Sequence, residues 1–230
     1  MFVNPDRLEA LREQNPFLPS TELAYQLLLD ALLDGHLKPG AHLNQNALAK
    51  QLGMSRSPVR DALLRLAGEG FVSHTPHGFQ APLLDGQDFA DFMEYRCELE
   101  CFAARLASHW ATMEQLAAME KNLTDYQQAI LHSDRPTATR LDSSFHALVG
   151  EAAHNRYLSS AYDQLLRQAR FYLIRLVPHQ NVVLNFQRHQ AIFQAIAAHN
   201  AHEAETATRL HMTDAMRTAL RVQKDQAPTE

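Results

Sequence analysis

The chain has 230 residues, which is long enough for two small domains or one larger domain. Hydrophobic residues make up 46% of it and only 8 residues are glycine, a composition that favours a packed and mostly helical protein. The formal net charge of −5 excludes a protein that binds nucleic acid through its overall charge, so any contact with DNA must come from a local basic patch.

Neither a membrane span nor a secretion signal is predicted. The sequence contains no run of about eighteen apolar residues, and its first residues, MFVNPDRLEALREQNPF, are too polar for a signal peptide. The two cysteines, Cys97 and Cys101, are four residues apart in a predicted helix, a spacing that rarely permits an unstrained disulfide. We therefore expect a reduced, cytoplasmic protein.

The N-terminal arm, residues 1–19, contains three prolines and is predicted to be mobile, although Met1–Gln14 could form a short helix. An amphipathic helix is predicted to run from Ser20 or Thr21 to about Leu33, because leucine and alanine recur four residues apart along it. This helix is expected to be the first element of a folded domain.

Two short helices joined by a tight turn are predicted within Asn44–Phe71. Apolar residues recur at helical spacing on both sides of a break at Gly53–Ser55. Ser55 is a good N-cap for the second helix, and Pro58 sits in its first turn, where the missing N–H costs nothing. The opening turns of this helix, from which a recognition helix reaches DNA, carry Arg56, Ser57 and Arg60.

A small β-hairpin is predicted to complete a winged helix-turn-helix of three helices over residues 20–84. Residues 71–75 and 78–83 have the pattern of two short strands around a Pro-His-Gly turn. The wing would place His77 and Gly78 near a neighbouring groove or phosphate. Four basic residues and one acidic residue within residues 50–65 provide a modest but concentrated positive charge.

Residues 85–224 are predicted to form a second domain that is almost entirely helical. Each break between helices contains a residue suited to capping or breaking a helix, and the loops are short, so neighbouring helices should pack antiparallel as a bundle. Residues 225–230 are predicted to be a frayed tail. The predicted helices cover residues 86–109, 112–132, 136–152, 155–177, 181–199 and 201–223.

The run Pro39–Val72, PGAHLNQNALAKQLGMSRSPVRDALLRLAGEGFV, resembles the DNA-binding domain of GntR-type transcriptional regulators. That family shows PG, then L-N-E, LA and LGVSR-PVR-AL--L--EG; here Gln45 replaces the acidic residue, which should alter a capping contact but not the fold. The helical remainder resembles the FCD effector domain of the FadR-like subgroup, and the whole resemblance covers about residues 20–220. The residues that carry the second part are Arg96-Cys-Glu-Leu-Glu100, Asp142-Ser-Ser-Phe-His146, His189 and His211.

By this resemblance, Arg56 and Arg60 match positions that touch base edges or phosphates, and Ser57 matches a small residue close to the DNA backbone. Arginine suits bidentate contact with guanine, and short hydroxyls suit phosphate oxygens. The alternative is that both arginines merely solvate an exposed helix face. Because one helix reads a short half-site, we expect a homodimer on a palindromic operator in double-stranded DNA.

The remaining DNA-binding candidates are weaker. Asn46 stands where some relatives carry a DNA-contacting arginine, so a contact from the first short helix is less certain than one from the second. Lys50 and Arg65 are either second-rank phosphate contacts or plain surface charges. Gly78 matches a wing-tip glycine, and His77 precedes it.

One carboxylate and three histidines are candidates for a metal site. Asp142 and His146 are four residues apart, hence on one face of one helix, while His189 and His211 lie in two further helices. Such a set suits zinc, nickel or manganese, with zinc the first choice, and in FCD domains these four positions hold a divalent metal at the floor of the effector pocket. The alternatives are ordinary core histidines, or a site that uses the two cysteines as soft donors.

The effector is predicted to be a small carboxylate, such as a sugar acid or a dicarboxylate. In the family, the arginine at Arg96 commonly faces the pocket, where it can pair with a ligand carboxylate; the alternative is a structural ion pair with Glu100 one turn on. Tyr172 and Arg175 are further candidates for effector contacts.

The sequence thus predicts a bacterial-type, ligand-responsive transcriptional regulator, a repressor, and not an enzyme. Two alternatives stay open. In a metal sensor, the ion itself would be the signal. In a metal-dependent hydrolase or lyase, open coordination positions would serve catalysis, but no glutamate of the HExxH kind accompanies the ligands and the winged domain would be unexplained.

Overall fold

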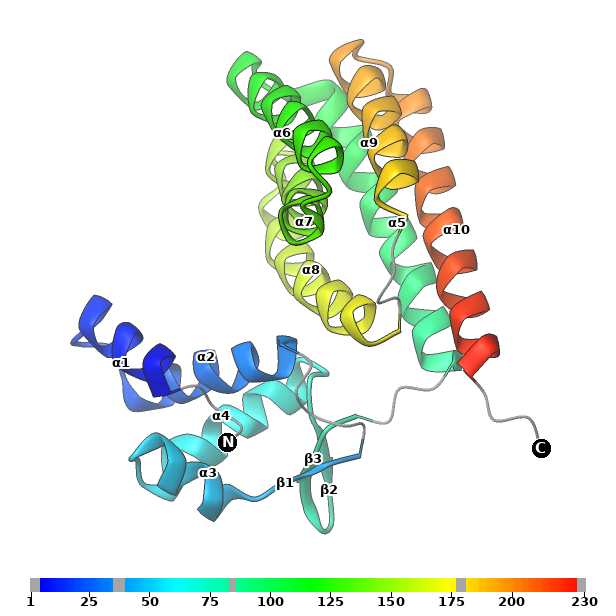
Figure 1. The fold of residues 1–230 in the computed structure, drawn as a ribbon. Helices are drawn as coiled ribbons and strands as arrows, with labels where there is room; N and C mark the ends of the chain where they lie inside the picture. The colour runs from blue at the N-terminus through cyan, green and yellow to red at the C-terminus, as the bar shows by residue number, and fades with distance from the viewer. Residues whose placement is uncertain (1–4, 35–39, 83–85, 177–180, 227–230) are drawn as a thin grey trace. The chain divides into compact units, whose positions relative to one another are not determined.

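A computed structural model describes residues 5–34, 40–82, 86–176 and 181–226 of the chain (Figure 1). The chain divides into two compact units, Met1–Asp85 and Gly86–Glu230, called here the winged unit and the helical unit. Within the described ranges there are ten helices and three short strands, so the predicted fold class is confirmed. None of the described helices combines the length and apolar character that crossing a membrane requires.

The winged unit begins with two packed helices, α1 (Pro5–Gln14) and α2 (Ser20–Leu33). The arm that we expected to be mobile contains a packed helix: Arg7 pairs with Asp30 of α2 at 2.9 Å, and Leu11 is buried. The cap predicted for α2 is wrong, because Pro19 holds the N-cap position and no side chain caps the helix.

The helix-turn-helix consists of α3 (Gln45–Leu52) and α4 (Arg56–Gly68). Asn44 caps α3 by accepting hydrogen bonds from the backbone N–H groups of Asn46 and Ala47 at 3.0 and 3.1 Å, so the change at Gln45 leaves the cap intact. Gly53 ends α3 with a φ of 60°, a left-handed conformation that suits glycine. Ser55 occupies the N-cap position of α4 as predicted, but its side chain makes no capping hydrogen bond.

Three short strands form one antiparallel sheet in the order β1-β3-β2. The predicted hairpin consists of β2 (Ser73–Thr75) and β3 (Gly78–Gln80), shorter at its outer ends than predicted. The sequence analysis missed β1 (His42–Leu43), which pairs with β3 directly before α3. A strand of two residues is too short to produce a recognisable alternation of polar and apolar side chains.

The helical unit contains the six predicted helices, with ends that differ by three residues or fewer. Their starts are set by side-chain caps, such as the capping box of Thr112 and Gln115 and the caps supplied by Asp134 and Asn181. In Figure 1, α5 and α10 run side by side, and both contact α9. The six helices are α5 (Gly86–Trp110), α6 (Met113–Leu131), α7 (Arg135–Ala152), α8 (Arg156–Leu176), α9 (Val182–Ala197) and α10 (Ala201–Gln226).

The core of the helical unit is mostly apolar. Aromatic and aliphatic side chains such as Tyr126, Phe145 and Leu165 are fully buried and hold the helices together. A group of buried polar and charged residues interrupts this core. Its members are Arg96, Glu100, Asp142, His146, His189 and His211.

Candidate functional site

Three buried histidines from three helices of the helical unit point toward one another. His146 lies on α7, His189 on α9 and His211 on α10, and none is more than 3% exposed. Nε2 of His211 is 3.2 Å from Nε2 of His189 and 3.4 Å from Nε2 of His146. One ligand nitrogen from each ring lies within 4.8 Å of the other two, close enough for a single metal ion to bind all three.

Asp142 lies at the edge of this histidine cluster. It precedes His146 by one turn of α7, and its Oδ1 is 3.9 Å from Nε2 of His189. The same oxygen accepts hydrogen bonds from the hydroxyl of Tyr126 at 3.3 Å and from the amide of Asn185 at 3.1 Å. Asp142 is therefore held beside the three nitrogens but is not part of their closest group.

The protonation of the three rings suits a cation. Burial and the neighbouring histidines lower the pKa of His189 and His211 well below the usual value, so both rings are neutral at pH 7. His146 donates from Nδ1 to a carboxylate oxygen of Glu100 at 2.9 Å, so its Nε2 is the ring nitrogen that faces the other two histidines. Since hydrogen bonds between the rings cannot satisfy all three nitrogens at once, this donor set fits a divalent metal ion.

A pocket opens next to the histidine cluster. Arg188 of α9 and Asp214 of α10 form an ion pair in its lining, with nitrogen–oxygen distances of 3.0 and 2.7 Å. The sequence analysis did not identify either residue. Their positions could have indicated them, because Asp214 follows His211 by about one turn and Arg188 is next to His189. The lining also includes Arg96, Asp142, His146 and His211.

Arg96 forms the ion pair with Glu100 and also faces the pocket. Its side chain is 4% exposed, and its Nε and Nη2 donate to Oε1 of Glu100, each at 3.1 Å. Arg96 also lines the pocket, so the same guanidinium takes part in the ion pair and faces the cavity. Tyr172 is not part of the lining, and its hydroxyl donates to Asp88 at 2.5 Å. The side chain of Arg175 lies outside the described residues.

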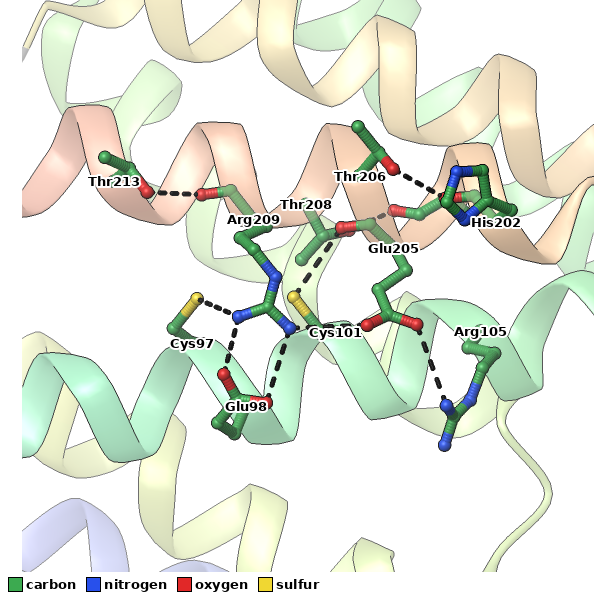
Figure 2. A network of polar contacts seen from close by, with 11 residues as sticks. Cys97, Glu98, Cys101, Arg105, His202, Glu205, Thr206, Thr208, Arg209 and Thr213 are labelled. Carbon is green, nitrogen blue, oxygen red and sulfur yellow. Dashed lines mark hydrogen bonds and ion pairs between the residues drawn. The ribbon is translucent and has the colours of Figure 1, made fainter.

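The two cysteines lie apart from the histidine cluster, on the side of α5 that packs against α10 (Figure 2). Arg209 of α10 donates to Glu98 at 2.5 and 3.3 Å and approaches the sulfur of Cys97 at 3.8 Å, while Cys101 donates to the carbonyl of Glu205 at 3.6 Å. The carboxylates of Glu98 and Glu205 compensate the guanidinium. The thiols therefore contribute no ligand to the histidine cluster.

The candidate DNA-reading residues of α4 are exposed. Arg56, Ser57 and Arg60 all present their side chains to solvent, and Arg60 has a 3.5 Å contact with Asp61, which is itself exposed. On the other elements, Lys50, Asn46 and His77 are exposed and Gly78 is half-buried.

Arg65 has a different setting on the same helix. Its guanidinium lies 3.7 Å from the centre of the Tyr25 ring and pairs with Glu22 at 2.8 Å and with Glu69 at 3.1 Å. These contacts join α4 to α2. We expected Arg65 to be either a phosphate contact or a plain surface charge. In the structure it instead forms contacts within the winged unit.

A winged helix-turn-helix, followed in the same chain by a helical unit whose pocket is lined in part by charged side chains and histidines, defines a DNA-binding regulator with an attached ligand-binding domain. Residues 20–78 match the family described as bacterial regulatory proteins, gntR family, and residues 91–214 match the FCD domain. The chain belongs to the GntR family of transcriptional regulators, in the group with an FCD effector-binding domain, which is a family of regulators and not of enzymes.

Individual relatives agree with this assignment. The chain is 30% identical over 178 residues to the Nta operon transcriptional regulator of Aminobacter aminovorans, covering 77% of this chain and 83% of that protein. It is 28% identical over 190 residues to the uncharacterized HTH-type transcriptional regulator YdhC of Bacillus subtilis, covering 81% and 85% of the two chains. The solved structure of E. coli McbR/YncC is similar with a TM-score of 0.73 at 25% identity, over 89% of this chain and 99% of that one.

Proposed function

We propose that the protein is a cytoplasmic transcriptional repressor that binds a palindromic operator as a homodimer and responds to a small organic acid held at a divalent metal site. The observation that carries this proposal is the convergence of three buried Nε2 atoms beside a pocket that Arg96 also faces. Family membership supplies the DNA-binding part, and the pocket supplies the reason to expect a ligand.

The metal site would use His146, His189 and His211, with Asp142 as the fourth ligand. Imidazole nitrogens with one carboxylate are borderline donors that suit zinc best, with nickel and manganese as alternatives. The 3.9 Å between Asp142 and His189 is the span that an ion bound to both would bridge. Such an ion would offer further positions to an oxygen ligand from the pocket.

The effector would bind between this metal and the cationic side chains of the pocket. Arg96 can pair with a carboxylate bidentately, and Arg188 adds a second guanidinium on another helix. Asp214, which holds Arg188 in the absence of ligand, would compete with the incoming anion. We therefore favour a small carboxylate, and we leave Tyr172 out of the binding set because its hydroxyl contacts Asp88.

On DNA, Arg56 and Arg60 would contact base edges and phosphates, supported by Ser57 and the wing residues His77 and Gly78. Lys50 and Asn46 of α3 would add contacts to the backbone. The positive charge for DNA is confined to residues 50–65, which have four basic residues and one acidic residue, so useful affinity requires two copies on one operator. The effector changes operator affinity only by its differential affinity for the free and DNA-bound forms.

A thermal-shift screen of small carboxylates, with and without a chelator, tests the proposal on tag-free protein. Any hit is then added to an operator-binding titration. A carboxylate that stabilises the protein only when metal is present, and that weakens operator binding, is the expected result. Protein that contains no metal and whose melting temperature does not respond to chelation would count against the site.

A metal sensor is the second candidate, because the three histidines form a ligand set that needs no organic molecule. In that case operator affinity would follow the concentration of zinc or nickel alone. Titrating the metal in the absence of any carboxylate separates the two functions.

A further inference from the structure

Glu100 of α5 is a buried carboxylate with partners on both sides. Only 1% of it is exposed. Its Oε1 accepts from Nε and Nη2 of Arg96, each at 3.1 Å. Its Oε2 accepts from Nδ1 of His146 at 2.9 Å and from the hydroxyl of Tyr162. A buried charge is costly unless it is paired and hydrogen-bonded, and Glu100 has both forms of compensation.

The chemistry of this carboxylate restricts the state of His146. Glu100 forms an ion pair with the guanidinium of Arg96, as a carboxylate does. An ionised carboxylate only accepts hydrogen bonds, so the ring of His146 must carry its proton on Nδ1. Nε2, the atom that faces His211 at 3.4 Å, is then the nitrogen of His146 that is left for a metal.

The packing around Tyr162 shows that this arrangement is built into the fold. Its ring lies against α7 at Gly150, where an added Cβ would be 2.4 Å from Cδ1 of the ring. Because real Cβ atoms essentially never come so close, Tyr162 can reach Glu100 in this position only with glycine at residue 150. Gly150 of α7 therefore leaves the space that the Tyr162 ring occupies when its hydroxyl donates to Glu100.

We propose that Glu100 is a positioning residue that links the metal site to the effector site. It orients His146 for metal binding through one oxygen, and it holds Arg96 at the pocket through the other. This inference rests on the proposed metal and carboxylate sites, and it adds a connection between them.

The link has a definite direction. A ligand carboxylate that binds Arg96 draws the guanidinium away from Glu100, which leaves more of the negative charge of Glu100 to His146. A stronger hydrogen bond to Nδ1 makes Nε2 a better donor to a metal, as in other pairs of carboxylate and histidine at metal sites. Effector and metal should therefore favour each other's binding, and thermodynamic linkage makes the effect reciprocal.

Zinc and nickel alone suffice to test this, by competition with a coloured chelator on tag-free protein. Glu100→Gln should weaken metal binding about 10–100-fold, the usual effect of removing the partner of a metal-binding histidine. Arg96→Gln is the matched control: it lies one turn away and breaks the same ion pair, but it leaves Glu100 free for His146. Its metal affinity should equal or exceed that of the wild type.

The opposite response of the two variants separates positioning from a general structural role. If both variants lose metal affinity to the same extent, or if Glu100→Gln binds metal as tightly as the wild type, the inference is overturned. If the wild type binds neither ion, the proposed metal site fails and this inference fails with it.

A second measurement covers the case in which Glu100→Gln does not fold. Long-range ¹H–¹⁵N spectra of the metal-free wild type report the tautomer of His146 directly. The expected result is a proton on Nδ1 of the neutral ring, and Tyr162→Phe should keep it because Glu100 still accepts from His146. A neutral ring with its proton on Nε2 in the wild type would overturn the inference without any variant.

Discussion

The charged side chains of the two candidate sites differ in their exposure to solvent. On α4, Arg56 and Arg60 are exposed, and Arg60 lies 3.5 Å from Asp61, which is also exposed. In the helical unit, Arg96 and Glu100 are buried and pair with each other. Exposed charges such as those of Arg56 and Arg60 contribute little to the free energy of unfolding. Removing one partner of a buried ion pair, in contrast, strongly destabilises the protein. The winged unit can therefore change its DNA contacts without unfolding, while the pocket combines recognition with stability.

Metal removal should give the largest effect and should act on the helical unit. A ligand that binds only the native state stabilises it by about 4 kcal/mol when the free concentration is about 1,000 times Kd. Chelation should therefore lower the melting temperature, which differential scanning calorimetry can record. In His211→Ala, which lacks one of the three ligands, the chelator should change nothing; a chelator effect of wild-type size in that variant would show that the ion binds elsewhere.

The winged unit should respond to Arg60→Ala with a loss of operator affinity of about 1–3 kcal/mol and almost no change in stability. A gel-shift titration and a thermal melt measure the two quantities. Arg65→Ala, on the same helix, provides the contrast: its contacts with Tyr25, Glu22 and Glu69 predict a loss of stability of about 1 kcal/mol and operator binding near the wild type. If both variants affect the same quantity, the division of roles along α4 is wrong.

The smallest effect concerns two polar residues that precede the short helices. Asn44→Ala should cost about 1 kcal/mol of unfolding free energy, because its side chain accepts two backbone hydrogen bonds at the start of α3. Ser55→Ala should stay within about 0.5 kcal/mol, because Ser55 makes no capping hydrogen bond to α4. Urea denaturation of both variants tests this, and an equal loss would show that Ser55 caps its helix in solution.

Local chemistry determined what the sequence predicted well. The breaks between helices of the helical unit fall at residues such as Thr112, Asp134 and Asn181. Their side chains cap the following helix through local hydrogen bonds, which do not depend on how the helices pack. The same local reasoning chose Ser55 as a cap and Tyr172 as a pocket residue. The structure gives Ser55 no capping bond and leaves Tyr172 outside the pocket lining.

Contacts between different helices could not be predicted from the spacing of residues along the chain. Asp142 and His146 could be placed on one face of α7, but nothing in the sequence indicated that Glu100, 46 residues earlier, would accept a hydrogen bond from His146. Asn185 likewise reaches Asp142 across 43 residues. Such neighbours depend on how whole helices pack, and a periodic pattern carries no information about them.

The short strand β1 gives the winged unit a mechanical property. Strand β3 lies at the centre of the sheet, between β1, which leads directly into α3, and β2, which follows α4. The wing is thus attached to the chain at both ends of the helix-turn-helix. Because strand pairing joins the segment before α3 to the segment after α4, we expect α4 and the hairpin to move together.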